Sequence, residues 1–173
     1  MKENFWSLKY LLGVVNSPIS TYFYRILHDI KGKVFAKISL TNLGDFPIPK
    51  PSESQKKKME SYVDSKLEKT KELVSVNAKL SRQLSRKFEI EKLTKKLQNW
   101  HTLTFAEFVK ELKKKKIKLG LSEEAEWEDY FEAEKAKAQT IQSEIDKTDR
   151  EIDKMVYELY GLTEEEIKIV EGN

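Results

Sequence analysis

The sequence predicts a mainly α-helical protein: a small α/β N-terminal module, then a long antiparallel, coiled-coil-like helical hairpin with a short helical insertion. The 173 residues include only ten Gly and Pro residues, too few for a sandwich or barrel rich in tight turns. The composition changes sharply after residue 51, and apolar residues then recur at helical spacing. We therefore expect two modules, residues 1–51 and residues 52–173.

The first module opens with two predicted helices, and it holds seven of the fifteen Phe and Tyr residues. Apolar residues three or four positions apart indicate a helix over residues 5–15. Ser17 is a favourable N-cap for a second, aromatic helix that ends near residue 28. Pro18 suits the first position of that helix, because the missing N–H of proline has no helical partner there.

The second half of this module is predicted to be largely extended. β-Branched and aromatic residues indicate a strand over residues 34–39, and residues 40–44 can form a single helical turn. Residues 47–51 contain three prolines, which fix φ and disfavour helix in the preceding residue. This proline run marks the boundary between the two modules.

A first long helix of about 40 residues is predicted to follow, with Ser52 or Ser54 as its cap. Its apolar stripe is imperfect, because the steps into Leu80 and Leu93 are irregular. The stripe consists of Met59, Val63, Leu67, Val74, Leu80, Leu84, Phe88, Leu93 and Leu97.

An insertion near residues 100–120 separates the two long helices. Thr104 and Glu107 form a capping-box pattern ahead of a short helix over residues 105–116. Gly120 is expected to end the insertion.

The second long helix, for which Ser122 is the expected cap, has the cleanest periodicity in the chain. Its apolar residues alternate by three and four in a heptad seam, with one skip at Glu134. Such a seam needs a partner, and we expect antiparallel pairing with the first long helix. Thr163 is expected to open a last short helix. The seam consists of Trp127, Phe131, Ala138, Ile141, Ile145, Thr148, Ile152, Met155 and Leu159.

The sequence contains no recognisable catalytic or metal-binding motif. There is no cysteine, the six glycines are isolated, and His28 and His101 are far apart. These features exclude a thiolate site, a phosphate-binding loop and a His-rich zinc helix. The acidic residues at 146–153 are interleaved with basic ones and are interpreted as a solvated helix face. We expect no catalytic residue, metal or cofactor in this segment.

No secretory signal or membrane span is predicted. The apolar stretch near the N-terminus is interrupted by Ser7 and Lys9, and no small-residue cleavage site follows it. No run of about 18–20 uncharged apolar residues occurs. We therefore expect a cytoplasmic protein.

The net charge of +3 conceals a strong asymmetry along the chain. Residues 50–118 carry twenty basic and nine acidic side chains, whereas residues 122–173 carry six basic and seventeen acidic ones. A basic array can neutralise phosphates and release counterions, which gives salt-dependent affinity for DNA. The competing interpretation is that these cations pair with the acidic helix beside them.

Two parts of the sequence carry a resemblance to a known family. Residues 10–18 read YLLGVVNSP, an aromatic helix and the predicted strand follow, and residues 43–49 read LGDFPIP. Near the other end, residues 151–167 read EIDKMVYELYGLTEEEI. In this order, with a helical spacer between them, these segments resemble the closing part of DNA target-recognition domains. Such domains occur in type I restriction specificity subunits, type IIG restriction–modification enzymes and adenine-N6 DNA methyltransferases.

The resemblance implies a role in specificity and not in catalysis. We expect this chain to be the C-terminal segment of a larger enzyme, whose methyltransferase domain would bind S-adenosylmethionine. The Asn-Pro-Pro-aromatic motif of that domain does not occur here. The implied partners are DNA and a methyltransferase or restriction domain upstream or in trans. A second copy of the chain is a further candidate partner. The insertion near residues 100–120 departs from the simpler two-helix spacers of the family.

Lysines near the predicted strand and at the start of the first long helix are the candidate DNA contacts, since phosphate contacts position a protein on DNA. They are Lys31, Lys33, Lys37, Lys50, Lys56, Lys57 and Lys58.

Three functions are in competition. The leading one is a DNA-specificity and spacer segment of a restriction–modification or DNA methyltransferase protein. The alternative is a helical protein–protein interaction or oligomerisation module without DNA contact. The third, an enzyme in its own right, has the least support from the sequence.

Overall fold

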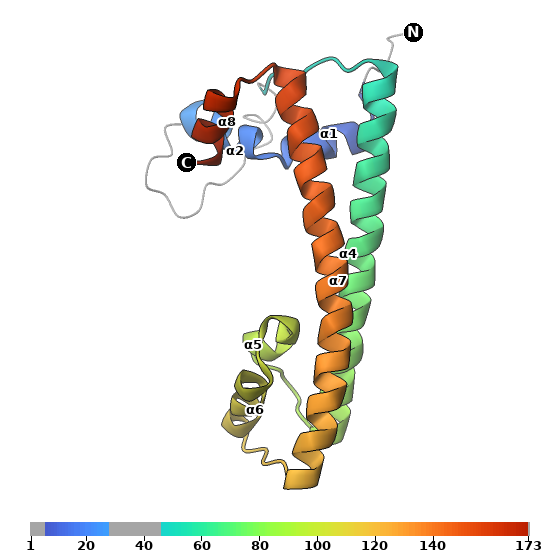
Figure 1. The fold of residues 1–173 in the computed structure, drawn as a ribbon, viewed down its shortest axis with the longest axis vertical. Coiled ribbons are helices and arrows are strands. Elements are labelled where there is room, and N and C mark those ends of the chain that lie inside the picture. Colours follow the sequence, from blue (N-terminus) through green and yellow to red (C-terminus); the bar gives the residue numbers. More distant parts are fainter. Residues whose placement is uncertain (1–5, 28–45, 173) are drawn as a thin grey trace. The chain divides into compact units, whose positions relative to one another are not determined.

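The computed structural model describes residues 6–27 and 46–172, and these ranges are mainly helical (Figure 1). They contain no strand. The predicted strand over residues 34–39 and the turn at 40–44 lie outside the described residues, so the predicted α/β character of the N-terminal module has no support. The helices are α1 (Leu8–Val15), α2 (Pro18–Leu27), α4 (Glu53–Phe88), α5 (Lys95–Gln98), the 3-10 helix η1 (Trp100–Thr102), α6 (Phe105–Lys114), α7 (Leu121–Tyr160) and α8 (Glu164–Glu171).

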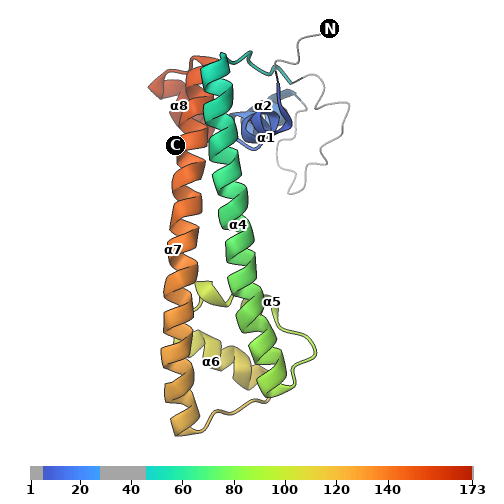
Figure 2. The same cartoon turned by 90° about the vertical axis from the view of Figure 1, so that its right-hand side faces the viewer.

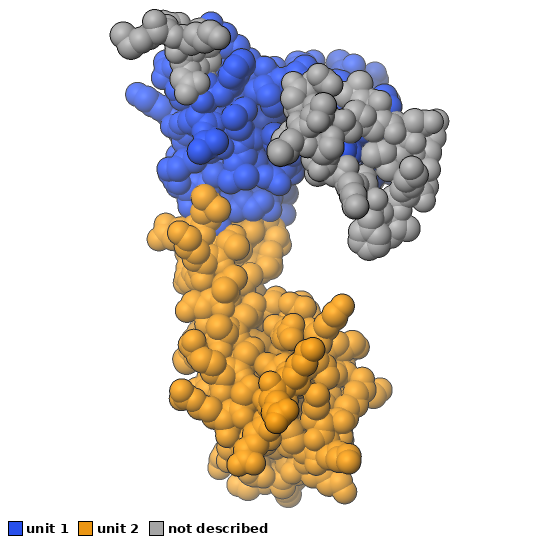
Figure 3. Space-filling view, turned by 180° about the vertical axis from the view of Figure 1, so that it is seen from behind, with its two compact units in different colours: residues 1–66, 147–173 blue, residues 67–146 orange. Residues whose placement is uncertain are grey.

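The chain divides into two compact units (Figure 3). Unit 1 comprises residues 1–66 and 147–173, and unit 2 comprises residues 67–146. Each unit therefore holds one part of α4 and one part of α7. The compositional boundary after residue 51 remains a prediction, because the compact units divide within the long helices instead.

The packing of α1 on α4 in unit 1 requires a glycine. A Cβ atom on Gly13 would lie 2.5 Å from Sδ of Met59 and 3.3 Å from Cγ2 of Val63. Met59 is completely buried, so its side chain has little room to move away. The glycine of the YLLGVVNSP segment is thus a packing residue.

The corner between α1 and α2 is closed by hydroxyl groups. Ser17 Oγ and Ser20 Oγ donate to the carbonyl oxygen of Val14 at 2.7 Å and 2.6 Å. The start of α2 at Pro18 confirms the predicted position of this helix. The hydroxyl of Ser17, however, donates back toward α1.

Two tyrosines hold the proline-rich segment of unit 1 in place. Tyr10 Oη donates to the carbonyl oxygen of Pro49 at 2.9 Å, and Tyr160 Oη donates to that of Pro47 at 2.8 Å. Phe46 packs edge-on against Phe23 and Tyr160. This segment has no regular secondary structure, as its prolines predicted.

The two long helices run in opposite directions within unit 1 (Figures 1 and 2). Tyr62 on α4 donates to Glu151 on α7, and Lys66, one turn later on α4, pairs with Asp149, which lies earlier on α7. The short helix α8 then packs against α2. Its N-terminus has the expected capping box, formed by Thr163 and Glu166.

The helices also run in opposite directions within unit 2. Lys69 pairs with Glu144 at 2.8 Å, Lys79 with Glu134 at 3.6 Å, and Lys87 with Glu123 at 3.4 Å. These pairs advance along α4 as they recede along α7. Three cations of α4 thus face acids of α7 in a consistent antiparallel order within this unit.

The first long helix is shorter than predicted and its seam differs. Helix α4 ends at Phe88, because Glu89 adopts a left-handed φ of 51°. The predicted continuation to Leu97 is therefore wrong. Two predicted seam residues in unit 2 are exposed, Leu67 at 41% and Val74 at 61%.

The insertion in unit 2 folds over an aromatic core. Trp100 and Phe108 are completely buried, and their rings lie 5.7 Å and 4.9 Å from that of Phe131 on α7. Thr104 and Glu107 form the predicted capping box of α6.

The start of α7 differs from the prediction. The helix begins at Leu121, so Ser122 lies inside it and does not cap it. The carboxylate of Glu123 instead accepts from the N–H of Gly120 at 3.3 Å.

Candidate nucleic-acid interface

The predicted DNA-contacting lysines do not gather at one well-formed site. Lys31, Lys33 and Lys37 lie outside the described residues. Lys50 is exposed on the proline-rich segment of unit 1, and residues 56–58 lie in the first two turns of α4.

The three lysines at the start of α4 differ in their surroundings. Lys56 lies 4.0 Å from a carboxylate oxygen of Glu53. The ammonium of Lys58 lies 5.7 Å from the centre of the Tyr62 ring, within range of a cation–π contact. Lys57 is exposed and makes no ion pair with any described residue.

Several cations further along α4 are paired with α7, as the competing interpretation of the charges expected. Lys66 does so in unit 1, and Lys69, Lys79 and Lys87 do so in unit 2. The pairs of Lys66, Lys69 and Lys87 are solvent-exposed, and such pairs contribute little to stability because water and salt screen them. They nevertheless reduce the positive field that this part of α4 presents to a polyanion.

The skip in the heptad seam is a buried charge. Glu134 occupies the seam position between Phe131 and Ala138, and its side chain is only 5% exposed. Lys137 donates to it at 2.7 Å, and Lys79 approaches from α4. The hydrogen bond from Lys137 is the main cause that lowers the pKa of Glu134 below its usual value.

The insertion, in contrast, has many more cations than acids. Residues 92–118 contain nine lysines and two glutamates, and all nine lysines are exposed. Only Lys114 makes an ion pair within the described part of the chain, with Glu111 at 2.6 Å.

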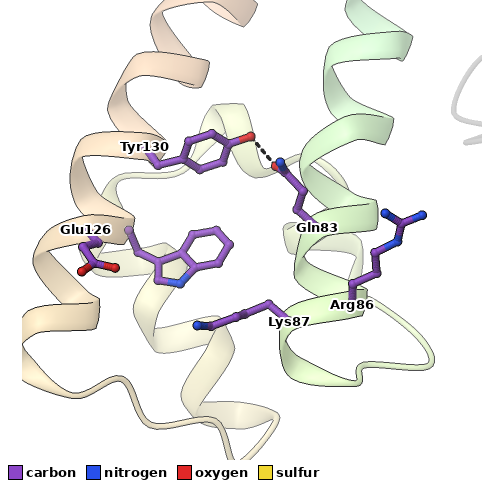
Figure 4. Close-up of a pocket in the computed structure, with 6 residues that line it drawn as sticks. Gln83, Arg86, Lys87, Glu126 and Tyr130 are labelled. Atoms are coloured by element: carbon purple, nitrogen blue, oxygen red, sulfur yellow. Dashed lines mark hydrogen bonds between the residues drawn. The ribbon is translucent and has the colours of Figure 1, made fainter.

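A shallow cleft of about 470 Å³ lies between α4 and α7 in unit 2 (Figure 4). Gln83, Arg86 and Lys87 line it from α4, and Tyr130 donates across it to Gln83. Trp127 is half-buried there and stacks near Phe88. An arginine beside aromatic rings can contact a phosphate while a ring stacks on a base. The residues that line this cleft are Gln83, Arg86, Lys87, Glu126, Trp127 and Tyr130.

A second cleft, of about 410 Å³, lies in unit 1 between α7 and α8. It contains Asp153, whose pKa is raised to about 6 by burial and by the negative charges of Asp149 and Glu171. Lys66 opposes this shift. The predicted solvated acidic face is therefore partly buried at this residue.

The described residues offer no metal site and no membrane-spanning helix. No group of three or more potential ligands lies together in residues 6–27 and 46–172. Among these helices, none combines the length and the apolar character that crossing a bilayer requires.

Sequence reasoning missed two features of this interface. The Lys113–Lys116 run is visible in the sequence. Only the structure shows, for the residues it describes, that several α4 cations are paired with α7, whereas most lysines of the insertion are not. The cleft beside Trp127 could not be found, because Trp127 was assigned to the seam.

The described residues thus define a helical protein in which two long helices pair in opposite directions. Residues 52–156 match the model of a family described as a domain of unknown function, DUF8810. This match covers more than half of the chain, so the protein belongs to that family. No curated protein and no solved structure matches the chain. The matched range includes the insertion but not residues 10–18 or 46–49.

Proposed function

We propose that this chain is a DNA-specificity and spacer segment of a restriction–modification or DNA methyltransferase protein. It positions DNA or the catalytic module and is not itself catalytic. The observation that carries the proposal is the meeting of the two resembling segments in one core. Phe46 contacts Tyr160, and Tyr160 donates to the carbonyl oxygen of Pro47, although Tyr160 comes from the opposite end of the chain.

In this proposal α4 and α7 form the spacer hairpin of a cytoplasmic protein. The separate or upstream catalytic domain, and not this segment, binds S-adenosylmethionine. The candidate lysines of unit 1 supply phosphate contacts that fix position without reading sequence. Among the described residues these are Lys50, Lys56, Lys57 and Lys58.

The test is DNA binding by the 173-residue chain as a function of salt. Fluorescence anisotropy with a short duplex should show an affinity that falls steeply between about 50 mM and 200 mM salt, because counterion release drives the association. A flat response over this range, or no binding at the lower salt concentration, contradicts the proposal.

A second candidate function, protein–protein interaction without DNA contact, is favoured by apolar residues exposed on unit 1. Leu8 is 85% exposed and Leu12 43%, and they lie one turn apart on α1. Ile26 on α2 is 59% exposed. Exposed apolar groups of this kind are typical of docking surfaces when they form a contiguous patch.

Size-exclusion chromatography with light scattering tests this second function. A dimer that reverts to a monomer in a Leu8→Lys, Leu12→Lys variant would favour it, provided that DNA binding is absent. A monomer at all concentrations would count against self-association through this face.

A further inference from the structure

The strongest unassigned feature of the molecule is the concentration of positive charge on residues 92–118 of unit 2. This range covers most of the predicted insertion and the segment that precedes it, and we name it the basic insertion. All its lysines are exposed, from both α5 and α6 and the segments that flank them. They are Lys92, Lys95, Lys96, Lys110, Lys113, Lys114, Lys115, Lys116 and Lys118.

Both acids of the basic insertion are engaged inside it. Glu107 closes the capping box of α6, where its carboxylate accepts from the N–H of Thr104 at 2.9 Å. Glu111 accepts from the hydroxyl of Thr94 at 3.0 Å and from Lys114 at 2.6 Å. Eight lysines are therefore left without an ion pair in the part of the chain that the structure describes.

Helix dipoles explain only part of this arrangement. Lysines near the end of α6, such as Lys113, are favoured there by the negative end of the helix. Helix α5 is a single turn of four residues, so its dipole does not account for Lys95 and Lys96.

Lys116 is an instance of charge placed against local stability. It follows the end of α6 with a left-handed φ of 64°, a conformation that glycine adopts most readily. The N–H of Ile117 then donates to the carbonyl oxygen of Leu112 at 3.1 Å, which completes the helix end. Residues retained in such strained conformations cluster at functional sites.

We propose that the basic insertion is the main DNA-backbone contact of this protein, ahead of the lysines at the start of α4. This inference rests on the proposed function and places its DNA contact in unit 2. Lysines act as flexible point charges, so the surface fits the phosphates of duplex DNA of any sequence. Two of the competing lysines, Lys56 and Lys58, already interact with neighbouring side chains.

The test compares two variants of the full chain that lose the same charge. One replaces Lys113, Lys115, Lys116 and Lys118 by Gln, and the other replaces Lys50, Lys56, Lys57 and Lys58 by Gln. The slope of log affinity against log salt should fall by about 0.9 for each phosphate contact removed. We expect the insertion variant to lose two or more contacts by this measure, and the α4-start variant to lose fewer.

A pair of single substitutions separates charge from stability. Lys116→Gly and Glu89→Gly both relieve a left-handed residue after a helix in unit 2, but they remove opposite charges. Both variants should melt at a higher temperature. Lys116→Gly should weaken DNA binding, whereas Glu89→Gly should leave it unchanged or strengthen it.

The outcomes are distinguishable. If the unmodified chain shows no salt-dependent DNA binding, the proposed function fails, and this inference fails with it. If the unmodified chain binds DNA but the insertion variant keeps its slope, only the inference is overturned. Equal effects of Lys116→Gly and Glu89→Gly on DNA affinity would also overturn it, because charge would then not determine binding.

Discussion

Unit 1 and unit 2 use their polar side chains differently. In unit 1, Tyr10, Ser17 and Tyr160 donate hydrogen bonds to backbone carbonyl oxygens of the same unit. In unit 2, the lysines of the basic insertion extend into solvent with few acidic partners. The first arrangement satisfies the chain's own backbone, and the second leaves charge available for a partner.

This difference teaches that the residues that are most recognisable in the sequence can serve packing alone. The YLLGVVNSP segment is accounted for by packing and by hydrogen bonds within unit 1. The lysines of the basic insertion in unit 2 form no recognisable motif, yet they carry more unpaired positive charge than the described candidate lysines of unit 1. Four predictions test this contrast, in order of decreasing effect.

Removal of the Phe131 ring from the aromatic core should lower the stability of unit 2 more than that of unit 1. Phe131→Ala removes a completely buried side chain that contacts Trp100, Phe105 and Phe108. We expect a loss of about 3–5 kcal/mol in the free energy that protects unit 2. Hydrogen exchange should accelerate in α6 but little in α8. Equal acceleration in both helices would mean that the units unfold together.

Substitution of the packing glycine tests unit 1. Gly13→Ala places a methyl group against Met59 and Val63, and overpacking of this kind costs about 1–3 kcal/mol. Gly120→Ala is the control, because its Cβ would meet only Glu123 Oε2 at 3.8 Å. Urea unfolding should show a loss for Gly13→Ala alone. A stabilised Gly13→Ala would show that Met59 moves aside freely.

The raised pKa of Asp153, about 6, predicts a pH dependence of unit 1. Between about pH 4 and pH 6 the folded state holds a proton that the unfolded state, with a pKa near 3.9, has released. The contribution of this group to stability therefore falls as the pH rises through that window.

Asp153→Asn should stabilise the protein at pH 8 by about 1 kcal/mol, a value reduced for the partial exposure of the carboxyl group. The gain should disappear near pH 3, where the carboxyl group is largely protonated in both states. Denaturant unfolding at the two pH values measures this difference. A gain that is equal at both would assign the effect to packing.

The smallest expected effects are at the two left-handed residues. Lys116→Gly and Glu89→Gly should each stabilise unit 2 by about 0.5–1 kcal/mol, because glycine adopts φ near 50–65° without strain. Thermal unfolding of both variants provides the measurement. A destabilised Lys116→Gly would show that the lysine side chain contributes packing that outweighs its backbone strain.

Helix positions were predicted from sequence where local signals determine them. The capping boxes at Thr104 and Thr163 set the starts of α6 and α8, and Pro18 sets the start of α2. The end of α4 was not predicted, because the left-handed residue that follows the helix is usually a glycine, and here it is Glu89. A cap at Ser122 would start the helix at Glu123, but the carboxylate of Glu123 accepts from the N–H of Gly120 and α7 begins two residues earlier, at Leu121.

The candidate interface depends on partners that are distant in sequence, which limited its prediction. The pairing of Lys69 with Glu144 and of Lys79 with Glu134 determines how much charge α4 retains. Periodicity indicates that two helices pair, but it does not set their register to within one residue.

Glu134 has a consequence for how α4 and α7 align as unit 2 folds. A purely apolar seam would tolerate a slip of one heptad, about 10 Å along the axis. After such a slip in one direction Glu72 would replace Lys79 opposite Glu134, and the buried carboxylate would keep only Lys137 from its own helix. Because an incompletely paired buried charge is costly, this glutamate disfavours that slipped alignment, which the leucines and isoleucines alone would permit.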